Sequence, residues 1–308
     1  MQLSQFFKSN VSKPAVVQSN ATTEVVEQKD NAVSDLVDRW QRVVKVNPDD
    51  KNSRLQLLEA YVSAFQWNEA DLLLDKLKAE YPDDYQVRLN LAKVIQRKGS
   101  AKEIREVWAA LHKDYPDMLD PIIGLARSHN VDDDQETAIK LVDKALSIDS
   151  KDNRAHLIKG KIKQRQNMTD EAIEIYFSIL EREPDHYEAE ANLSSALLKQ
   201  ERYEELKPRL EKAMKMHPNQ TSFNMFLFRM HAKQDNHTEA LKVIDGLLMR
   251  DGKNSKVEYY LEKSDLLLKL GRNDEADAVC EAALQSYPNN VKLLTLYARV
   301  GQRKLRTA

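Results

Sequence analysis

The chain has 308 residues, of which 42% are apolar and 31% charged, and its formal net charge at pH 7 is −2. Seven glycines and one cysteine favour a soluble α-helical protein and exclude an internal disulfide or a zinc site built from several cysteines. No apolar run is long enough for a signal peptide or a membrane span, so the sequence predicts a cytoplasmic protein.

The first 30 residues differ in composition from the rest of the chain. They are rich in Ser, Thr, Asn, Gln and Val and lack helical periodicity after Phe7, which predicts a flexible N-terminal arm over residues 1–30. A short helix at the tip would place Leu3, Phe6 and Phe7 on one apolar face, which could dock on a partner or on the rest of the chain. The first regular helix is then predicted over about residues 31–46.

A turn recurs at a constant interval from residue 48 onward. Pro48, Pro82 and Pro116 are separated by 34 residues each. The series continues through the turn formers Ser150, Pro184, Pro218 and Gly252 and reaches Pro288 two residues late. Because proline ends helices, the series predicts a turn in every repeat and a two-residue insertion within residues 251–256. Pro121 and Pro208 lie outside the series and are predicted to fall in first turns of helices.

Each interval holds two helices with apolar periodicity, separated by a short polar break. The interval predicts seven repeats, at residues 51–84, 85–118, 119–152, 153–186, 187–220, 221–256 and 257–290. A terminal helix over residues 291–306 is expected to close the array with a more polar outer side. The fold class predicted is therefore all-α, with one α-solenoid over residues 31–308.

A small residue usually begins each second helix, where the two helices cross, and a bulky residue follows four positions later. Ala172 and Tyr176 form such a pair within GKIKQRQNMTDEAIEIYFSILEREP, the segment from Gly160 to Pro184. In these features the chain resembles the tetratricopeptide repeat family, whose helix–turn–helix unit has about 34 residues, an A-x3-F step and a terminal proline. The resemblance implies a right-handed superhelix of about seven repeats, whose first helices line the inner, concave surface.

The sequence contains no motif of a phosphate-binding loop, a dinucleotide site, a serine hydrolase or a zinc protease. The seven histidines form no pair at a convincing ligand spacing, and the run Asp132-Asp133-Asp134 is interpreted as the start of a helix rather than a calcium loop. Cys280 is interpreted as a core residue. We therefore expect no catalytic residue, no cofactor and no metal, that is, a protein that is not an enzyme.

Basic residues recur at two places of the first helices, one helical turn apart. From the second repeat onward, 11 of these 14 places are Lys or Arg, against about two expected from the average composition. The preference of cations for the last turn of a helix explains part of the second column. The predicted peptide-binding residues are Lys93, Arg97, Arg127, Lys161, Arg165, Lys199, Arg229, Lys233, Lys269, Arg299 and Arg303.

Acidic residues gather instead on the second helices, as at Glu171 and Asp274, so the sequence predicts a basic groove and an acidic back. An apolar row that includes Leu89, Ile123 and Leu157 runs beside the basic columns. This row either packs in the core or exposes apolar spots next to the positive charge.

These features predict a scaffold or adaptor that binds an acidic segment of another protein, with a few apolar anchors, along the basic groove. Nucleic acid or an acidic polysaccharide is the alternative ligand, although the columns offer few aromatic side chains for base stacking. A helical accessory subunit of a larger enzyme is a third interpretation.

The arm itself contains a segment of the kind the groove is predicted to accept. In EVVEQKD, residues 24–30, acidic residues surround Val25 and Val26. We hypothesise that the arm occupies the groove of its own or a neighbouring copy, which would allow self-association; the alternative is a tail without contacts.

Overall fold

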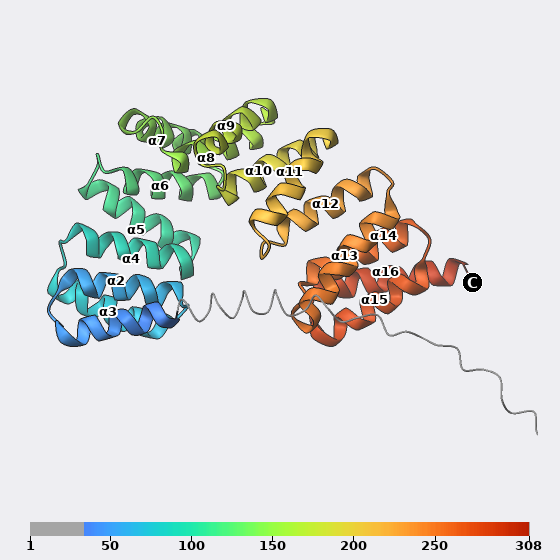
Figure 1. The fold of residues 1–308 in the computed structure, drawn as a ribbon, viewed down its shortest axis with the longest axis horizontal. Coiled ribbons are helices and arrows are strands. Elements are labelled where there is room, and N and C mark those ends of the chain that lie inside the picture. Colours follow the sequence, from blue (N-terminus) through green and yellow to red (C-terminus); the bar gives the residue numbers. More distant parts are fainter. Residues whose placement is uncertain (1–33, 308) are drawn as a thin grey trace, which may run out of the picture. The chain divides into compact units, whose positions relative to one another are not determined.

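The computed structural model describes residues 34–307, and this part of the chain is an all-α solenoid without a β-strand (Figure 1). A helix over residues 34–46, which we call the leading helix, comes first. The helices that follow are α2 (Lys51–Ser63), α3 (Trp67–Glu80), α4 (Tyr85–Lys98), α5 (Ala101–Asp114), α6 (Leu119–Val131), α7 (Gln135–Ile148), α8 (Asn153–Arg165), α9 (Thr169–Arg182), α10 (Tyr187–Lys199), α11 (Tyr203–Met216), α12 (Ser222–Lys233), α13 (His237–Asp251), α14 (Val257–Lys269), α15 (Asn273–Ser286) and α16 (Val291–Thr307). The predicted arm lies outside the described residues.

The chain divides into two compact units, one ending at Asp71 and the other beginning at Leu72. The first unit holds the leading helix and α2, which are joined by a hydrogen bond of 3.1 Å from Gln41 Nε2 to Tyr61 Oη. Asp50 caps the N-terminus of α2: its carboxylate accepts from the backbone N–H of Ser53 at 2.9 Å and so satisfies one of the unpaired donors of the first turn.

In the second unit each helix from α4 to α16 packs on the next one in the chain. Alternate helices also touch, in the pairs α6–α8, α8–α10, α10–α12 and α14–α16, and all of these are first helices of their repeats. Successive first helices therefore lie against one another, as expected for a stack of helical hairpins.

The second helices bury their small and bulky residues in the core. On α9, Ala172 and Tyr176 are fully buried, together with Ile179 one turn further on. Gly160 of α8 lies directly against Tyr176, since a Cβ at this glycine would come within 2.4 Å of the ring. Burying a large apolar side chain stabilises the fold by ~1.5–3 kcal/mol, so these positions hold each hairpin together.

The break between the two helices of a repeat contains a residue with positive φ in six of the seven repeats. These residues are Phe65, Asp133, Asn167, Glu201, Asp235 and Gly271, with φ between 56° and 72°. The break between α4 and α5 differs, because Gly99 has φ −80° and Ser100 forms a capping box with Glu103.

The insertion within residues 251–256 forms the short 3-10 helix η1 (Gly252–Asn254), after which Ser255 is buried and accepts a 2.6 Å hydrogen bond from Tyr287 Oη on its carbonyl. Pro121 lies in the first turn of α6 as predicted, whereas Pro208 lies inside α11, so its predicted position was wrong. The terminal helix α16 buries Leu293, Leu296 and Val300, and its exposed side carries Arg299 and Arg303 together with the apolar residues Val291, Leu294 and Leu305.

Candidate functional site

We count register positions from the first residue of each repeat, so that the two predicted basic columns are positions 9 and 13. Two cations at position 13 are held by the positive-φ residue of the preceding repeat. Lys199 Nζ donates to Asn167 Oδ1 at 3.1 Å, and Lys233 Nζ donates to Glu201 Oε1 at 3.1 Å. These cations link adjacent repeats.

Two arginines at position 13 reach backbone carbonyls instead. Arg165 donates to the carbonyl oxygen of Asn130 and, at 3.2 Å, to its side-chain oxygen, and it lies 3.9 Å from Asp133. Arg303 donates to the carbonyl oxygen of Leu268 at 2.8 Å. Both carbonyls belong to the preceding repeat, so these arginines also join neighbouring hairpins.

Cations at position 9 of the middle repeats meet carboxylates of the next first helix. Lys161 Nζ lies 2.7 Å from Glu188 Oε1. Arg229 contacts both Glu258 and Glu262, at 2.6 and 2.7 Å. Burial by itself would raise the pKa of Glu188, but the hydrogen bond from Lys161 and its positive charge outweigh burial and hold that pKa below its usual value.

Arg299 of α16 is paired with Asp265 of α14, which is also at position 9. Carboxylates of the first helices therefore interrupt the basic surface from α10 onward. Sequence reasoning assigned acids to the second helices and missed these, although acidic residues recur at position 2 of the repeats, at Asp120, Glu188 and Glu258.

Lys93, Arg97, Arg127 and Lys269 form no hydrogen bond or ion pair within the described part of the chain. The first three converge on one cleft of about 350 Å³. Its lining residues are Lys93, Gln96 and Arg97 of α4, Trp108 of α5, Asp120, Ile123, Gly124 and Arg127 of α6, and Arg154 of α8.

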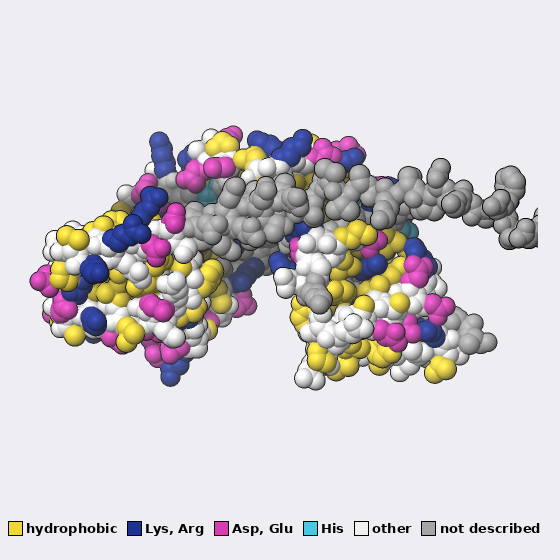
Figure 2. Space-filling model, turned by 60° about the horizontal axis from the view of Figure 1, so that its bottom comes forward, with side chains coloured by type: hydrophobic (Ala, Val, Ile, Leu, Met, Phe, Trp, Pro, Cys, Tyr) yellow, Lys and Arg dark blue, Asp and Glu magenta, His cyan; other side chains and the backbone are white. Residues whose placement is uncertain are grey.

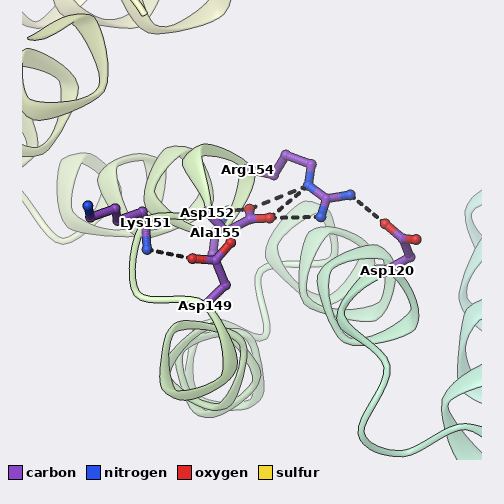
Figure 3. Close-up of polar contacts among 6 residues, drawn as sticks. All are labelled: Asp120, Asp149, Lys151, Asp152, Arg154 and Ala155. Atoms are coloured by element: carbon purple, nitrogen blue, oxygen red, sulfur yellow. Dashed lines mark hydrogen bonds and ion pairs between the residues drawn. The ribbon is translucent and has the colours of Figure 1, made fainter. Parts of the chain in front are cut away.

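Asp120 is the single carboxylate in this lining, and it is bound to Arg154 rather than to the lysine or arginines across the cleft. Arg154 Nη1 donates to Asp120 Oδ1 at 2.5 Å, while its Nη2 donates to Asp152 Oδ2 at 2.7 Å (Figure 3). Asp152 also caps α8 by accepting from the N–H of Ala155 at 2.9 Å. The cleft thus keeps an excess of positive charge.

The register explains why charge is left over at this end. Glu188, the partner of Lys161, is at position 2 of the repeat that follows it. The residue in the same relation to Arg127 is Arg154, which has the same charge. Arg127 therefore faces no carboxylate at the place where Lys161 finds one.

Trp108 forms an apolar wall of the cleft and is only 3% exposed. A Cβ at Gly124 would lie 2.2 Å from the indole ring, so this close contact requires a glycine. The indole Nε1 is buried and has no acceptor among the described residues. Sequence reasoning singled out neither residue for the site.

A second recess of about 260 Å³ adjoins the cleft and shares Gln96, Gly124 and Arg127 with it. Ala101, Ile104 and Val131 give this recess its apolar lining, and Val131 is 65% exposed. Positive charge and apolar surface therefore lie next to each other between α4, α5 and α6.

Other residues noted in the sequence serve the fold. Asp134 caps α7 through the N–H of Thr137 at 3.2 Å, and Cys280 is fully buried, which raises the pKa of its thiol. In the apolar row beside the basic columns, Leu89, Ile123 and Leu157 are each 3% exposed and pack in the core.

The described residues include no group of three or more His, Cys, Asp or Glu placed to hold a metal ion. None of the helices in residues 34–307 has the length and apolar character needed to cross a membrane.

Comparison with known proteins agrees with the fold. The family model of the tetratricopeptide repeat matches residues 257–290. In sequence, 142 residues are 26% identical to the mouse protein O-mannosyl-transferase TMTC1, a match that covers 45% of this chain but 15% of that relative.

Among solved structures, the chain is similar to the APC/C hetero-tetramer Cut9–Hcn1, with a TM-score of 0.67, 13% identity, and coverage of 87% of this chain and 52% of that one. It is also similar to a tetratricopeptide repeat protein from Parabacteroides merdae, with a TM-score of 0.60, 13% identity, and coverage of 81% and 98%.

The fold thus defines a helical-repeat solenoid, the class of protein in which stacked hairpins offer extended binding surfaces. Residues 257–290 match the tetratricopeptide repeat family, and the solved structures show that the chain has the fold of a tetratricopeptide repeat solenoid.

Proposed function

We propose that this tetratricopeptide repeat protein is a non-catalytic scaffold that binds an acidic segment of another protein in the cleft between α4, α5 and α6. The observation that carries the proposal is the cluster of Lys93, Arg97 and Arg127, which form no ion pair or hydrogen bond among the described residues and lie beside an apolar recess. A scaffold role for this chain agrees with its structural similarity to Cut9–Hcn1, which was solved as a hetero-tetramer.

The geometry restricts the chemistry of the ligand. Arg127 lines both the cleft and the recess, so an acidic residue of the ligand should lie next to an apolar one. Carboxylates would meet Lys93, Arg97 and Arg127, and an aliphatic side chain would enter the recess near Ile104 and Val131. An extended acidic segment with alternating apolar residues meets both requirements.

Charge alone does not supply the affinity of a stable complex. Each exposed ion pair contributes ~0.2–1 kcal/mol, whereas a micromolar complex requires ~8 kcal/mol. An apolar anchor adds ~1.5–3 kcal/mol, and the remainder must come from further contacts along the first helices. The proposed extension of the site comprises the other eight predicted residues, Lys161, Arg165, Lys199, Arg229, Lys233, Lys269, Arg299 and Arg303.

Nucleic acid and acidic polysaccharide remain the alternative ligands of the same cations, and the structure offers little for base stacking. Trp108, the aromatic residue of the cleft, is 3% exposed and is covered by Gly124. The match to the transferase spans 15% of that relative, so we assign no transferase chemistry to this chain.

The test is affinity capture from the source cell, with nuclease present, followed by titration of synthetic peptides from the captured proteins. The triple variant Lys93→Glu, Arg97→Glu and Arg127→Glu should lose acidic-peptide binding by about a hundredfold, since attraction becomes repulsion at three places. Binding to the wild type should also weaken as salt rises toward physiological strength, where the screening length is ~8 Å.

The matched control carries the same change of charge on α11, as Lys207→Glu, Lys212→Glu and Lys215→Glu, at three exposed residues outside the cleft. Equal affinity of both triple variants for the peptide would refute the proposed site. Capture that disappears on nuclease treatment would favour the nucleic-acid alternative.

We also propose the arm as an internal competitor for this cleft. Deletion of residues 1–30 should then tighten peptide binding and increase hydrogen exchange in α4 and α6. If affinity and exchange do not change, the arm is a tail without contacts.

A further inference from the structure

The leading helix and α16 each expose a face that is buried in every complete repeat. The leading helix follows the register of a second helix, in which Trp40 is at position 24 and Val43 at position 27. The residues at position 24 of the seven repeats are all buried: Leu74, Trp108, Val142, Tyr176, Leu210, Ile244 and Cys280. Val43 is 42% exposed, as is Leu36 on the same side of the leading helix, and Trp40 is half-buried between them.

α16 shows the complementary pattern, because it follows the register of a first helix. The residues at position 8 of the seven repeats are all buried: Leu58, Ala92, Ala126, Gly160, Ser194, Phe228 and Ser264. Ala298 is at position 8 of α16 and is exposed, together with Leu294 and Leu305. Figure 2 shows hydrophobic side chains gathered on the part of the molecule that holds the C-terminal helices.

Within a repeat, the residue at position 8 of the first helix contacts the residue at position 24 of the second helix. Cys280 Sγ lies 3.5 Å from Ser264 Oγ, and the Tyr176 ring covers Gly160. Among the described residues, no second helix covers the equivalent side of α16. Instead a hollow of about 830 Å³ opens between α15 and α16, lined by Ala298, Gly301 and Leu305 and by Asp274 and Asp277, both of which are paired with Lys304.

We propose that the leading helix of a second copy of this chain packs into this hollow and completes an eighth repeat between the two molecules. Position 24 would then place Trp40 of one copy over Ala298 of the other, in the way that Tyr176 covers Gly160. Space is available, because a Cβ at Gly301 would meet no atom within 4 Å, whereas Gly124 and Gly160 are tightly covered.

The charges agree with the antiparallel direction of a helical hairpin. Residues 291–307 contain no acid, and Arg299 and Arg303 lie in the C-terminal half of α16. The leading helix carries Asp35 and Asp38 in its first turns, which an antiparallel arrangement brings to that half. A precedent exists between α8 and α9, where Lys163 at position 11 and Glu171 at position 19 lie 2.8 Å apart.

The contact is head-to-tail, since it joins different surfaces of the two copies. Each copy of a pair therefore keeps one unused face, and the pair keeps one face of each kind, so such contacts form open chains unless a ring closes. This self-association uses the leading helix and not the arm of residues 1–30, and it does not involve the cations of the cleft between α4 and α6.

The experiment measures molar mass against concentration by sedimentation and light scattering, with the 308-residue chain and two blocked variants. Leu36→Glu with Val43→Glu blocks the leading helix, and Leu294→Glu with Ala298→Glu blocks α16. Each double variant by itself should need an about hundredfold higher concentration to associate. The control pair, Leu72→Glu with Met249→Glu, changes two exposed apolar residues outside both faces and should assemble like the wild type.

Mixing the two blocked variants provides the decisive readout, because one intact face of each kind remains. They should form a one-to-one dimer that grows no further. A disulfide between Trp40→Cys in one chain and Ala298→Cys in the other should form on mixing and should fail to form within either variant alone. A wild-type chain that stays monomeric, or a dimer that survives in both blocked variants, would overturn the proposal.

Discussion

The first helices near the N-terminal end of the second unit and those in its middle carry cations at the same register positions but use them differently. At position 9, Lys161 and Arg229 are bound to glutamates of the next first helix, at distances of 2.6–2.7 Å. Lys93 and Arg127 occupy the same position and have no such partner among the described residues. Equivalent charges thus join repeats in one region and form no ion pair among the described residues in the other.

For Arg127 the difference originates in the neighbouring repeat and not in the cation. Glu188 stands where Lys161 can reach it, whereas Arg154 stands at the equivalent place beside Arg127. Lys93 differs, because Asp120 stands at its equivalent place and is bound to Arg154 instead.

The largest effect is expected from a pair of glycine substitutions. Gly124→Val and Gly160→Val each force a side chain into an aromatic ring that lies 2.2 or 2.4 Å from the position of the new Cβ. Both should lower the free energy of unfolding by ~2–3 kcal/mol in a urea titration, because overpacking displaces the ring. Only Gly124→Val should also weaken acidic-peptide binding, since Trp108 lines the cleft. Equal loss of binding in both variants would contradict the separation.

Arg154→Glu should convert the cleft into the arrangement of the middle repeats. The new carboxylate would stand beside Arg127 as Glu188 stands beside Lys161. Peptide affinity should fall by about tenfold, because the cleft loses a cation and gains a competing acid. Arg154→Gln is the control and should weaken binding less. A larger loss with glutamine than with glutamate would contradict the explanation by charge.

Arg229→Gln and Arg127→Gln compare paired and unpaired cations at position 9. Removing Arg229 leaves Glu258 and Glu262 without their partner. Because these side chains are partly exposed, we expect the free energy of unfolding, measured in urea, to fall by ~0.5–1 kcal/mol. Arg127→Gln should have a free energy of unfolding within ~0.5 kcal/mol of the wild type but should weaken peptide binding. The opposite order of stabilities would show that the pairs do not hold the repeats together.

The smallest effect is a change in the pH dependence of stability. The pKa of Glu188 is lowered in the folded chain from 4.5. Its contribution to the free energy of unfolding is therefore present at neutral pH and is lost as pH falls through the lowered value. Lys161→Met removes the main cause of the lowering and should reduce this acid-induced loss by a few tenths of a kcal/mol. Lys93→Met, which breaks no ion pair, should leave the profile unchanged. Thermal melting between pH 7 and pH 3 measures both variants.

The repeat architecture could be predicted from the sequence because its causes are local. Proline and small polar residues end helices where they occur, and apolar residues at helical spacing mark the buried side of each helix. The Ala172 and Tyr176 step and the core position of Cys280 follow from these rules, and the structure confirms that all three residues are buried. Pro208 shows the limit of local rules, because it lies on the exposed side of α11, where the helix tolerates it.

The sequence by itself determined the repeat length, the pairing of helices and the positions of the cations, since these depend on neighbours within one or two helical turns. Tertiary structure decided which cations are paired, because the partners of Lys161 and Lys199 are 27 and 32 residues away. It also decided that Trp108 packs on Gly124, and that Trp40 and Ala298 lack the cover their register positions receive elsewhere. Pairing and burial depend on which side chains from distant repeats come within a few ångströms, and only the stacking of the helices sets those distances.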